Sequence, residues 1–129
     1  MKTKSIRQTA TINAKPSVIY DALMDSKKHG KFTGGKASIR NKVGGKFTVY
    51  DGYINGINLE LKKNKKIVQS WQASDWPKEH YSRVTFNLAP HNGGTKISFY
   101  HSGIPAEHAE SIKKGWVDFY WNPLKKMYP

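Results

Sequence analysis

Side chains with catalytic or metal-binding chemistry are sparse in this sequence, and their spacing is not that of an active site. Asp75, Glu79 and His80 fall within one short loop candidate, which by itself fixes no acid–base geometry. His101 and His108 flank a strand-to-helix connection without the spacing of a helical metal-binding pair. No serine lies in a nucleophile-elbow pattern, and no glycine-rich phosphate loop follows a predicted strand. The sequence therefore predicts no catalytic residue, no metal site and no cofactor.

Composition narrows the chemistry further. None of the 129 residues is cysteine, which excludes disulfides, thiol nucleophiles and thiolate ligands. A content of 37% hydrophobic and 12% aromatic residues is typical of a folded protein rather than a disordered one. This length fits one domain, which we expect over residues 1–129.

The apolar residues come in short runs. The longest, such as 18–20 and 119–121, hold three residues, whereas a membrane span needs about 20. The lysine-bearing start, 1–7, leads into no apolar stretch of the kind that a secretory signal requires. We therefore expect no membrane span and a cytoplasmic location.

Basic side chains dominate the charge. There are 22 lysine and arginine residues against nine acidic ones, a net charge of +13 with histidine neutral. Only Arg7, Arg40 and Arg83 carry the guanidinium group that reads bases, so we expect no sequence-specific nucleic-acid binding. The densest lysine group, 62–66, is typical of a solvated hairpin tip. The excess fits either a plain solvated surface or an anionic partner.

Alternating apolar and polar residues predict a series of strands. The segments are 5–13, 47–50, 57–62, 67–73, 83–88 and 97–101. Turn residues separate the later ones at 51–52, 55–56, 63–64 and 91–94. Short strands at hairpin spacing, each with one apolar face, indicate a curved antiparallel sheet that needs a cover.

Two short helices and a long one supply that cover. Pro16 suits the first turn of a helix over 16–24, and 26–32 predicts a second, strongly basic helical turn. Over 105–127 apolar residues recur at the helical spacing, and Pro123 should bend the last turn. This order predicts an α+β fold in which the sheet wraps around a long C-terminal helix.

The strand faces that point toward the long helix carry large apolar side chains. They are Phe47, Val49, Leu59, Leu61, Trp71, Val84, Phe86, Ile97 and Phe99, with Trp116, Phe119 and Tyr120 opposite them on the helix. Two interpretations are open: the side chains fill the space, or they line a cavity for a small hydrophobic ligand. Trp116 should anchor the helix, and Gly115 beside it should permit close backbone approach.

Three further residues have two interpretations each. Gln69 and His101 are polar exceptions on the inward faces, so each either bonds inside the protein or orients a ligand. Trp76, in a loop and held extended by Pro77, either points outward as a contact or folds back as a lid on the sheet edge.

Eight short motifs, taken in order, carry a family resemblance across nearly the whole chain. The motifs are Gly44-Gly45-Lys46-Phe47, Asp51-Gly52, Ile67-Val68-Gln69-Ser70-Trp71, Trp76-Pro77, Val84-Thr85-Phe86, Gly93-Gly94-Thr95-Lys96-Ile97, Gly103-Ile104-Pro105 and Gly115-Trp116 followed by Tyr120-Trp121. They resemble the START-like (SRPBCC) superfamily, whose helix-grip fold is also that of the birch pollen allergen. More narrowly, the chain is similar to the C-terminal domain of the activator of heat-shock protein 90 ATPase homologue family.

The resemblance implies a non-enzymatic binding module. Such a module contacts a chaperone or client, holds a small hydrophobic ligand between the sheet and the long helix, or does both. Eukaryotic co-chaperones of the family have a separate N-terminal domain, for which 129 residues leave no room, so we expect a stand-alone relative. The alternative is a START-like enzyme of cyclase or hydrolase type, which two inward carboxylates close together would favour.

A chaperone of the heat-shock protein 90 class is the partner that the resemblance implies. The basic N-terminal half would meet an acidic surface on it. The candidate contact residues are Lys27, Lys28, Lys31, Lys36, Lys46 and Trp76.

Overall fold

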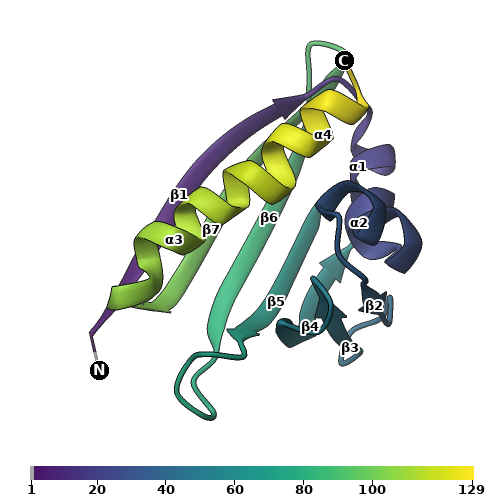
Figure 1. Ribbon diagram of the computed structural model, residues 1–129. Helices are drawn as coiled ribbons and strands as arrows, with labels where there is room; N and C mark the ends of the chain where they lie inside the picture. Colours follow the sequence, from purple (N-terminus) through teal and green to yellow (C-terminus); the bar gives the residue numbers. More distant parts are fainter. Residues whose placement is uncertain (1) are drawn as a thin grey trace.

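One seven-stranded antiparallel sheet organises the computed structural model, which describes residues 2–129 (Figure 1). Its strands are β1 (Thr3–Ile12), β2 (Ser38–Ile39), β3 (Lys46–Val49), β4 (Ile54–Lys62), β5 (Lys66–Ala73), β6 (Ser82–His91) and β7 (Gly94–Pro105). They lie in the order β1-β7-β6-β5-β4-β3-β2, so the first strand pairs with the last.

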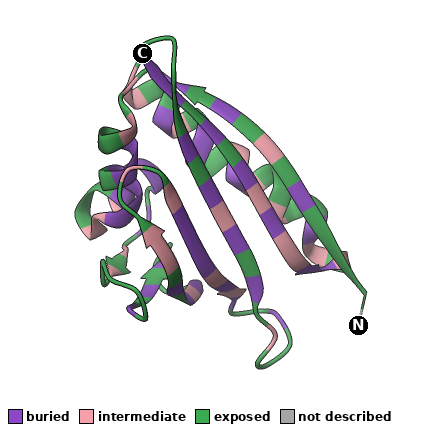
Figure 2. Cartoon of the chain, turned by 180° about the vertical axis from the view of Figure 1, so that it is seen from behind, coloured by how far each residue is buried: buried purple, intermediate pink, exposed green. Residues whose placement is uncertain are grey.

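The period-two pattern explains which face of the sheet is buried. In β1, Ile6, Ala10 and Ile12 are buried, and in β6 Val84 and Phe86 are buried while their neighbours along the strands are more exposed. Figure 2 shows this alternation from the outer side of the sheet. The predicted antiparallel sheet with one apolar face is confirmed.

Two short helices, α1 (Pro16–Met24) and α2 (Ser26–Thr33), follow β1. Pro16 occupies the first turn of α1, as its fixed φ angle favours. The Asp25 carboxylate accepts a hydrogen bond from the backbone N–H of Lys28 at 2.9 Å and so caps α2. Gly34 ends α2 with a φ of 82°, a left-handed conformation that glycine adopts readily.

The C-terminal helical segment crosses the concave face of the sheet along β1 and β7 (Figure 1). It comprises a 3₁₀ turn (Ala106–His108), α3 (Ala109–Trp116), a π-helical stretch (Val117–Trp121) and α4 (Asn122–Met127). The predicted long C-terminal helix is confirmed, but it begins after Pro105 because β7 continues through that residue, and a π turn interrupts it. In that turn the N–H of Asn122 bonds to Val117 O, directly before Pro123, which has no N–H to donate.

Hydrogen bonds to β1 hold this helical segment. Trp121 Nε1 donates to Gln8 Oε1 at 2.7 Å, and Gln8 Nε2 donates to the carbonyl of Lys113 at 3.1 Å. One glutamine therefore ties both α3 and the π-helical stretch to the edge of the sheet. The predicted α+β helix-grip fold is confirmed. Within residues 2–129, no helix is long and apolar enough to cross a bilayer.

One predicted turn at β4 is wrong, and one edge strand was not predicted. The expected turn at Asn55-Gly56 lies inside β4, where a Cβ on Gly56 would sit 1.8 Å from the carbonyl oxygen of Ser70. Glycine here permits close approach of β5, rather than a turn. The two-residue edge strand β2 is also absent from the prediction, since Ser38–Ile39 is too short to show alternation.

Leu59 does not face the helix. The register of β4 against β5 shifts between Asn58 and Glu60, and the inward positions before that shift belong to Gly56 and Asn58. Leu59 is consequently 43% exposed on the outer face, and Leu61, after the shift, is only partly buried. A one-residue change of register moves every side chain of a strand to the other face, which is why simple alternation failed here.

Candidate functional site

The space between the sheet and the C-terminal helix has a filled half and an open half. We call the filled half the aromatic core and define it by Phe86, Phe99, His101, Trp116 and Trp121. The ring centroids of Trp116 lie 4.4 Å from Phe99, 5.8 Å from Phe86 and 6.0 Å from Trp121. Trp116 is 3% exposed, which confirms the prediction that it lies at the contact between helix and sheet.

Half of the predicted inward residues belong to the packed interior alone. They are Phe47, Gln69, Val84, Phe86, Ile97, Phe99 and His101, whereas Val49, Trp71, Trp116 and Tyr120 are buried but also border the open half. In this part of the molecule the space-filling interpretation holds.

His101 is buried on β7 with both ring nitrogens occupied. Trp116 Nε1 donates to His101 Nδ1 at 3.0 Å, so Nδ1 carries no proton and the neutral ring is protonated on Nε2. Nε2 therefore donates to Ser82 Oγ at 2.7 Å, and that hydroxyl donates to the carbonyl of Trp71 at 2.7 Å. Burial lowers the pKa of His101 to about 3, so the ring is neutral at neutral pH. No nitrogen of His101 is left to orient a ligand.

Gln69 also has its partner inside the protein. Its Nε2 donates to Asn58 Oδ1 at 3.0 Å, and Asn58 Nδ2 donates to the carbonyls of Arg40 at 2.8 Å and Lys42 at 3.2 Å. This chain of hydrogen bonds ties β5 and β4 to the loop before β3. The interior interpretation of Gln69 is therefore the one that the geometry supports.

A second buried histidine escaped the sequence reasoning. His29 Nδ1 donates to the carbonyl of Leu23 at 2.9 Å, which leaves Nε2 to accept from the Tyr120 hydroxyl at 2.7 Å. Burial lowers the pKa of His29 to about 4 and raises that of Tyr120. The pair joins α2 to the C-terminal helical segment. Because the surrounding 26–32 segment is rich in lysine, its sequence predicts only a short, strongly basic helical turn.

The open half is a cavity of about 210 Å³. It is lined by Thr33, Val49, Tyr50, Tyr53, Ile54, Trp71, Ser111, Ile112, Gly115, Trp116, Phe119 and Tyr120. We call it the aromatic cavity. Sequence reasoning had placed Val49, Trp71, Trp116, Phe119 and Tyr120 at such a site, and the structure brings these five together.

Three exposed aromatic rings surround the mouth of the cavity. Tyr50, Tyr53 and Phe119 are 39%, 37% and 39% exposed, and the rings of Tyr50 and Phe119 lie 5.0 Å apart. Tyr50 and Tyr53 were missed, because alternation along β3 assigns Tyr50 to the outer face. Instead, Tyr50 leaves the strand with a φ of 53° and begins a turn, which brings its ring to the cavity.

Gly115 has a different role from the one expected. A Cβ at this position would meet only Cδ2 of Phe119, at 4.0 Å. The missing side chain therefore does not serve close packing against the sheet. Gly115 lines the aromatic cavity, and the absence of its side chain keeps that wall open.

Trp76 is buried, which corrects its assignment to a partner surface. It is 6% exposed, and its ring lies 5.4 Å from Trp71 and 5.9 Å from His80. The lid interpretation is the correct one. Its Nε1 is buried with no hydrogen-bond partner in the structure.

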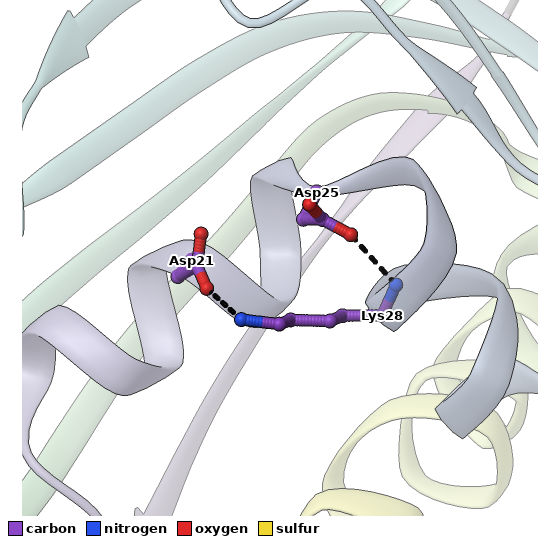
Figure 3. A network of polar contacts seen from close by, with 3 residues as sticks. All are labelled: Asp21, Asp25 and Lys28. Carbon is purple, nitrogen blue, oxygen red and sulfur yellow. Dashed lines mark hydrogen bonds and ion pairs between the residues drawn. The ribbon is translucent and has the colours of Figure 1, made fainter.

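The predicted contact lysines divide into three groups. Lys27, Lys31 and Lys36 line one shallow depression at α2, together with Gly30, Gly34 and Gly35 among others; we call it the basic depression. Lys46 is exposed on β3 and does not line it. Lys28 is also exposed but pairs with Asp21, as Figure 3 shows. That hydrogen bond raises the pKa of Lys28.

Residues 2–129 offer little for acid–base chemistry in the interior. The buried polar side chains among them are His29, Thr33, Asn58, Gln69, Ser82, Thr95 and His101, with no carboxylate. Nor do the described residues contain a cluster of three or more groups that could hold a metal ion. The condition that would favour an enzyme, two inward carboxylates close together, is not met in this part of the chain.

A family model described as "Activator of Hsp90 ATPase homolog 1-like protein" matches residues 13–128. Activator of 90 kDa heat shock protein ATPase homolog 1 of Homo sapiens is 29% identical over 126 residues, covering 98% of this chain and 37% of the human protein. Homolog 2 of Mus musculus is 35% identical over 95 residues, covering 74% of this chain and 29% of the mouse protein. The chain thus spans about a third of the length of these relatives.

Solved structures of other proteins match this chain over nearly its whole length. The crystal structure of an HSP90 activator from Plasmodium falciparum has a TM-score of 0.89 and 29% identity, with 97% of both chains covered. The solution structure of the Aha1 dimer from Colwellia psychrerythraea has a TM-score of 0.78 at 21% identity, covering 95% of this chain and 96% of that one. At that lower identity the likeness is one of fold alone.

Proposed function

The chain belongs to the family of activator of Hsp90 ATPase homolog 1-like proteins, and from that premise we propose that it is a non-enzymatic binding module for a 90 kDa heat-shock chaperone. In this proposal residues 1–129 act as one domain in the cytoplasm, and the basic depression contacts an acidic surface of the chaperone. The chain spans about a third of its curated relatives. We therefore expect micromolar binding with little stimulation of ATP turnover.

The basic depression is the observation that carries this proposal. Lys27, Lys31 and Lys36 line it, all three are exposed, and no carboxylate is among its lining residues. Exposed lysines that have no internal ion pair keep their charge available for a partner. Such surfaces mainly accelerate association and make it sensitive to salt.

Titration of the purified chaperone from the same cell tests this function, with binding and ATP turnover followed in one series. We expect saturable binding that weakens with salt and falls at least ten-fold in the double variant Lys27→Glu/Lys31→Glu. The matched control is Lys63→Glu/Lys65→Glu, which makes the same charge change at the β4–β5 hairpin tip. Equal losses of chaperone affinity in the two variants would show that net charge, and not the basic depression, determines binding. No binding at high micromolar protein and low salt would overturn the proposal.

Lys28 supplies an internal comparison. Because Asp21 already pairs with its ammonium group, Lys28→Ala should weaken chaperone binding less than Lys31→Ala does. Both are exposed lysines of α2, but Lys31 lines the basic depression, whereas Lys28 lies outside it and is held in the ion pair.

The aromatic cavity favours a second candidate function, the holding of a small hydrophobic ligand. Its volume of about 210 Å³ exceeds the roughly 150 Å³ of an apolar cavity that takes up benzene. Solvent extraction of the protein purified from its own cell, followed by mass spectrometry, tests this function. Gly115→Leu, which fills one wall of the cavity, is the matched blank. A compound recovered from both proteins equally would not come from the cavity.

A further inference from the structure

Four hydroxyl groups around the aromatic cavity already donate hydrogen bonds inside the protein. Thr33 Oγ1 donates to the carbonyl of His29 at 3.0 Å, and Ser111 Oγ donates to that of His108 at 3.0 Å. The Tyr53 hydroxyl donates to Asp75 at 2.7 Å. Tyr120 donates to His29, as described above. A ligand that required donors from these four hydroxyls would have to break bonds that they already make, so ring faces and shape dominate recognition.

Size and lining then fix the class of ligand. Six aromatic residues line a space of about 210 Å³: Tyr50, Tyr53, Trp71, Trp116, Phe119 and Tyr120. Aromatic walls favour other rings through offset stacking and edge contacts. A volume somewhat above that of a benzene-binding cavity suits a flat, uncharged molecule of about two fused rings.

The wall of the cavity is fastened to the basic depression. Gly35 and Lys36 line the depression, whereas Tyr50 lines the cavity. The backbone N–H of Lys36 donates to Asp51 Oδ1 at 2.8 Å, and the N–H of Asp51 donates back to Lys36 O at 2.9 Å. We call this pair of hydrogen bonds the latch.

Packing joins the same two segments. A Cβ on Gly35 would lie 2.8 Å from Cα of Tyr50, so the two backbones are in direct contact. Tyr50 and Asp51 have φ angles of 53° and 58°, which are unfavourable for residues other than glycine. Such a turn persists where its surroundings hold it, and here those surroundings are the cavity on one side and the latch on the other.

We propose that the aromatic cavity is an effector site, in which a flat, uncharged two-ring molecule holds the Tyr50–Gly52 turn and, through the latch, fixes the Lys36 side of the basic depression. The inference rests on the proposed chaperone-binding function and adds its regulation. A ligand in contact with Tyr50 stabilises the latched turn over looser alternatives. The chaperone then meets a depression that is already ordered. By linkage, each ligand strengthens binding of the other by the same factor.

The experiment uses 1-methylindole, which has two fused rings and no hydrogen-bond donor. Calorimetric titration should give sub-millimolar binding, and indole should bind within about three-fold of it because ring contacts, rather than a hydrogen bond from the indole N–H, supply the recognition. Proton–nitrogen NMR spectra of the chain should show the amides of Gly35 and Lys36 shifting on saturation. The dissociation constant for the chaperone should fall about five-fold in saturating 1-methylindole, at the lower end of typical coupling.

Variants of the latch separate coupling from binding. Asp51→Gly removes the carboxylate acceptor, and with it one of the two hydrogen bonds of the latch, but tolerates the positive φ. It should therefore reduce both the Lys36 shift and the gain in chaperone affinity. Asp51→Asn keeps a side-chain oxygen as acceptor and should preserve both. Gly115→Leu should block 1-methylindole and keep chaperone binding at its ligand-free level.

The outcomes distinguish this inference from the function on which it rests. If 1-methylindole binds but neither the Lys36 amide nor the chaperone affinity responds, the coupling is overturned while both binding functions stand. If 1-methylindole does not bind at millimolar concentration, the ligand class and the coupling are both overturned. If the chaperone does not bind at all, the proposed function fails, and the NMR comparison of wild type with Asp51→Gly still decides whether the latch transmits occupancy.

Discussion

The aromatic core and the aromatic cavity lie under the same helix and share Trp116. Aromatic rings fill the space in the core, whereas they surround an open space in the cavity. In the core, Trp116 and Phe99 are 4.4 Å apart and His101 has both nitrogens bonded. In the cavity, Tyr50 and Phe119 are exposed and leave a space of about 210 Å³. The difference lies in what closes each region. Strand residues meet helix residues in the core, whereas a turn and solvent-exposed rings bound the cavity.

Each region should therefore respond differently to perturbation. Interiors are close-packed, so a lost contact or an added proton in the core acts on the stability of the whole fold. A change in the cavity wall has room to be absorbed, and should act on ligand binding instead. The expected effects run from several kcal/mol in the core to about 1 kcal/mol at the cavity.

Acid should produce the largest effect, through the buried histidines. The folded-state pKa values of His101 and His29 are about 3 and about 4, below the roughly 6.5 of an unfolded histidine. Their contribution to stability is thus complete above pH 6.5, and it is lost as the pH falls through about 4 for His29 and about 3 for His101, because the unfolded chain binds the protons first. Together they should cost about 5 kcal/mol by pH 4.5.

Denaturant melts across this pH range measure the effect. His101→Gln keeps hydrogen-bonding capacity without a titrating group, and it should reduce the histidine part of the acid slope by about half. An unchanged slope in both His101→Gln and His29→Gln would show that carboxylates, not these histidines, govern acid unfolding.

Trp116→Ala should be the most damaging substitution in the aromatic core. It removes the ring that contacts Phe86, Phe99 and Trp121 and leaves Nδ1 of His101 without its donor. Loss of a large buried ring costs about 3–5 kcal/mol, measured as the free energy of unfolding in denaturant. A loss below about 1 kcal/mol would mean that the core relaxes as freely as the cavity does.

Ser82→Ala should have an intermediate effect. It leaves the N–H at Nε2 of His101 buried without an acceptor, at a cost of about 1–3 kcal/mol. The control is Ser98→Ala on β7, an exposed serine for which a change within about 0.5 kcal/mol is expected. Equal free energies of unfolding for the two variants would mean that a water molecule or another acceptor replaces Ser82 at Nε2 of His101.

Sequence patterns were sufficient for the core but not for the cavity. Alternation and helical spacing identify Phe99, Ile97 and Trp116 as inward residues, because burial of one face is a property of the element itself. Whether opposing side chains meet depends on how far apart the elements lie, which no periodicity encodes. Tyr50 shows the limit most clearly, since its place at the cavity follows from a positive φ angle just after β3.

Two other failures have similar causes. Leu59 was misplaced by a register shift, which depends on pairing with β5 rather than on β4 alone. Lys28 was grouped with its neighbours because its ion pair with Asp21 depends on how α1 and α2 meet. Local sequence predicts the helix or strand, whereas tertiary contacts decide which residues on one of its faces remain available to a partner.

The same substitution at two glycines compares the two regions most directly. Gly115→Ala, on α3 beside the cavity, adds a Cβ that meets nothing closer than 4.0 Å. Alanine is favoured over glycine inside a helix, so this variant should raise the free energy of unfolding by up to about 1 kcal/mol while narrowing the cavity. Gly56→Ala, in the sheet, would put a Cβ 1.8 Å from the carbonyl of Ser70 and should destabilise the protein. Denaturant melts decide the sign of each change. Destabilisation by Gly115→Ala would mean that the helix packs more closely there than its contacts indicate, and the aromatic cavity would then be closed in solution.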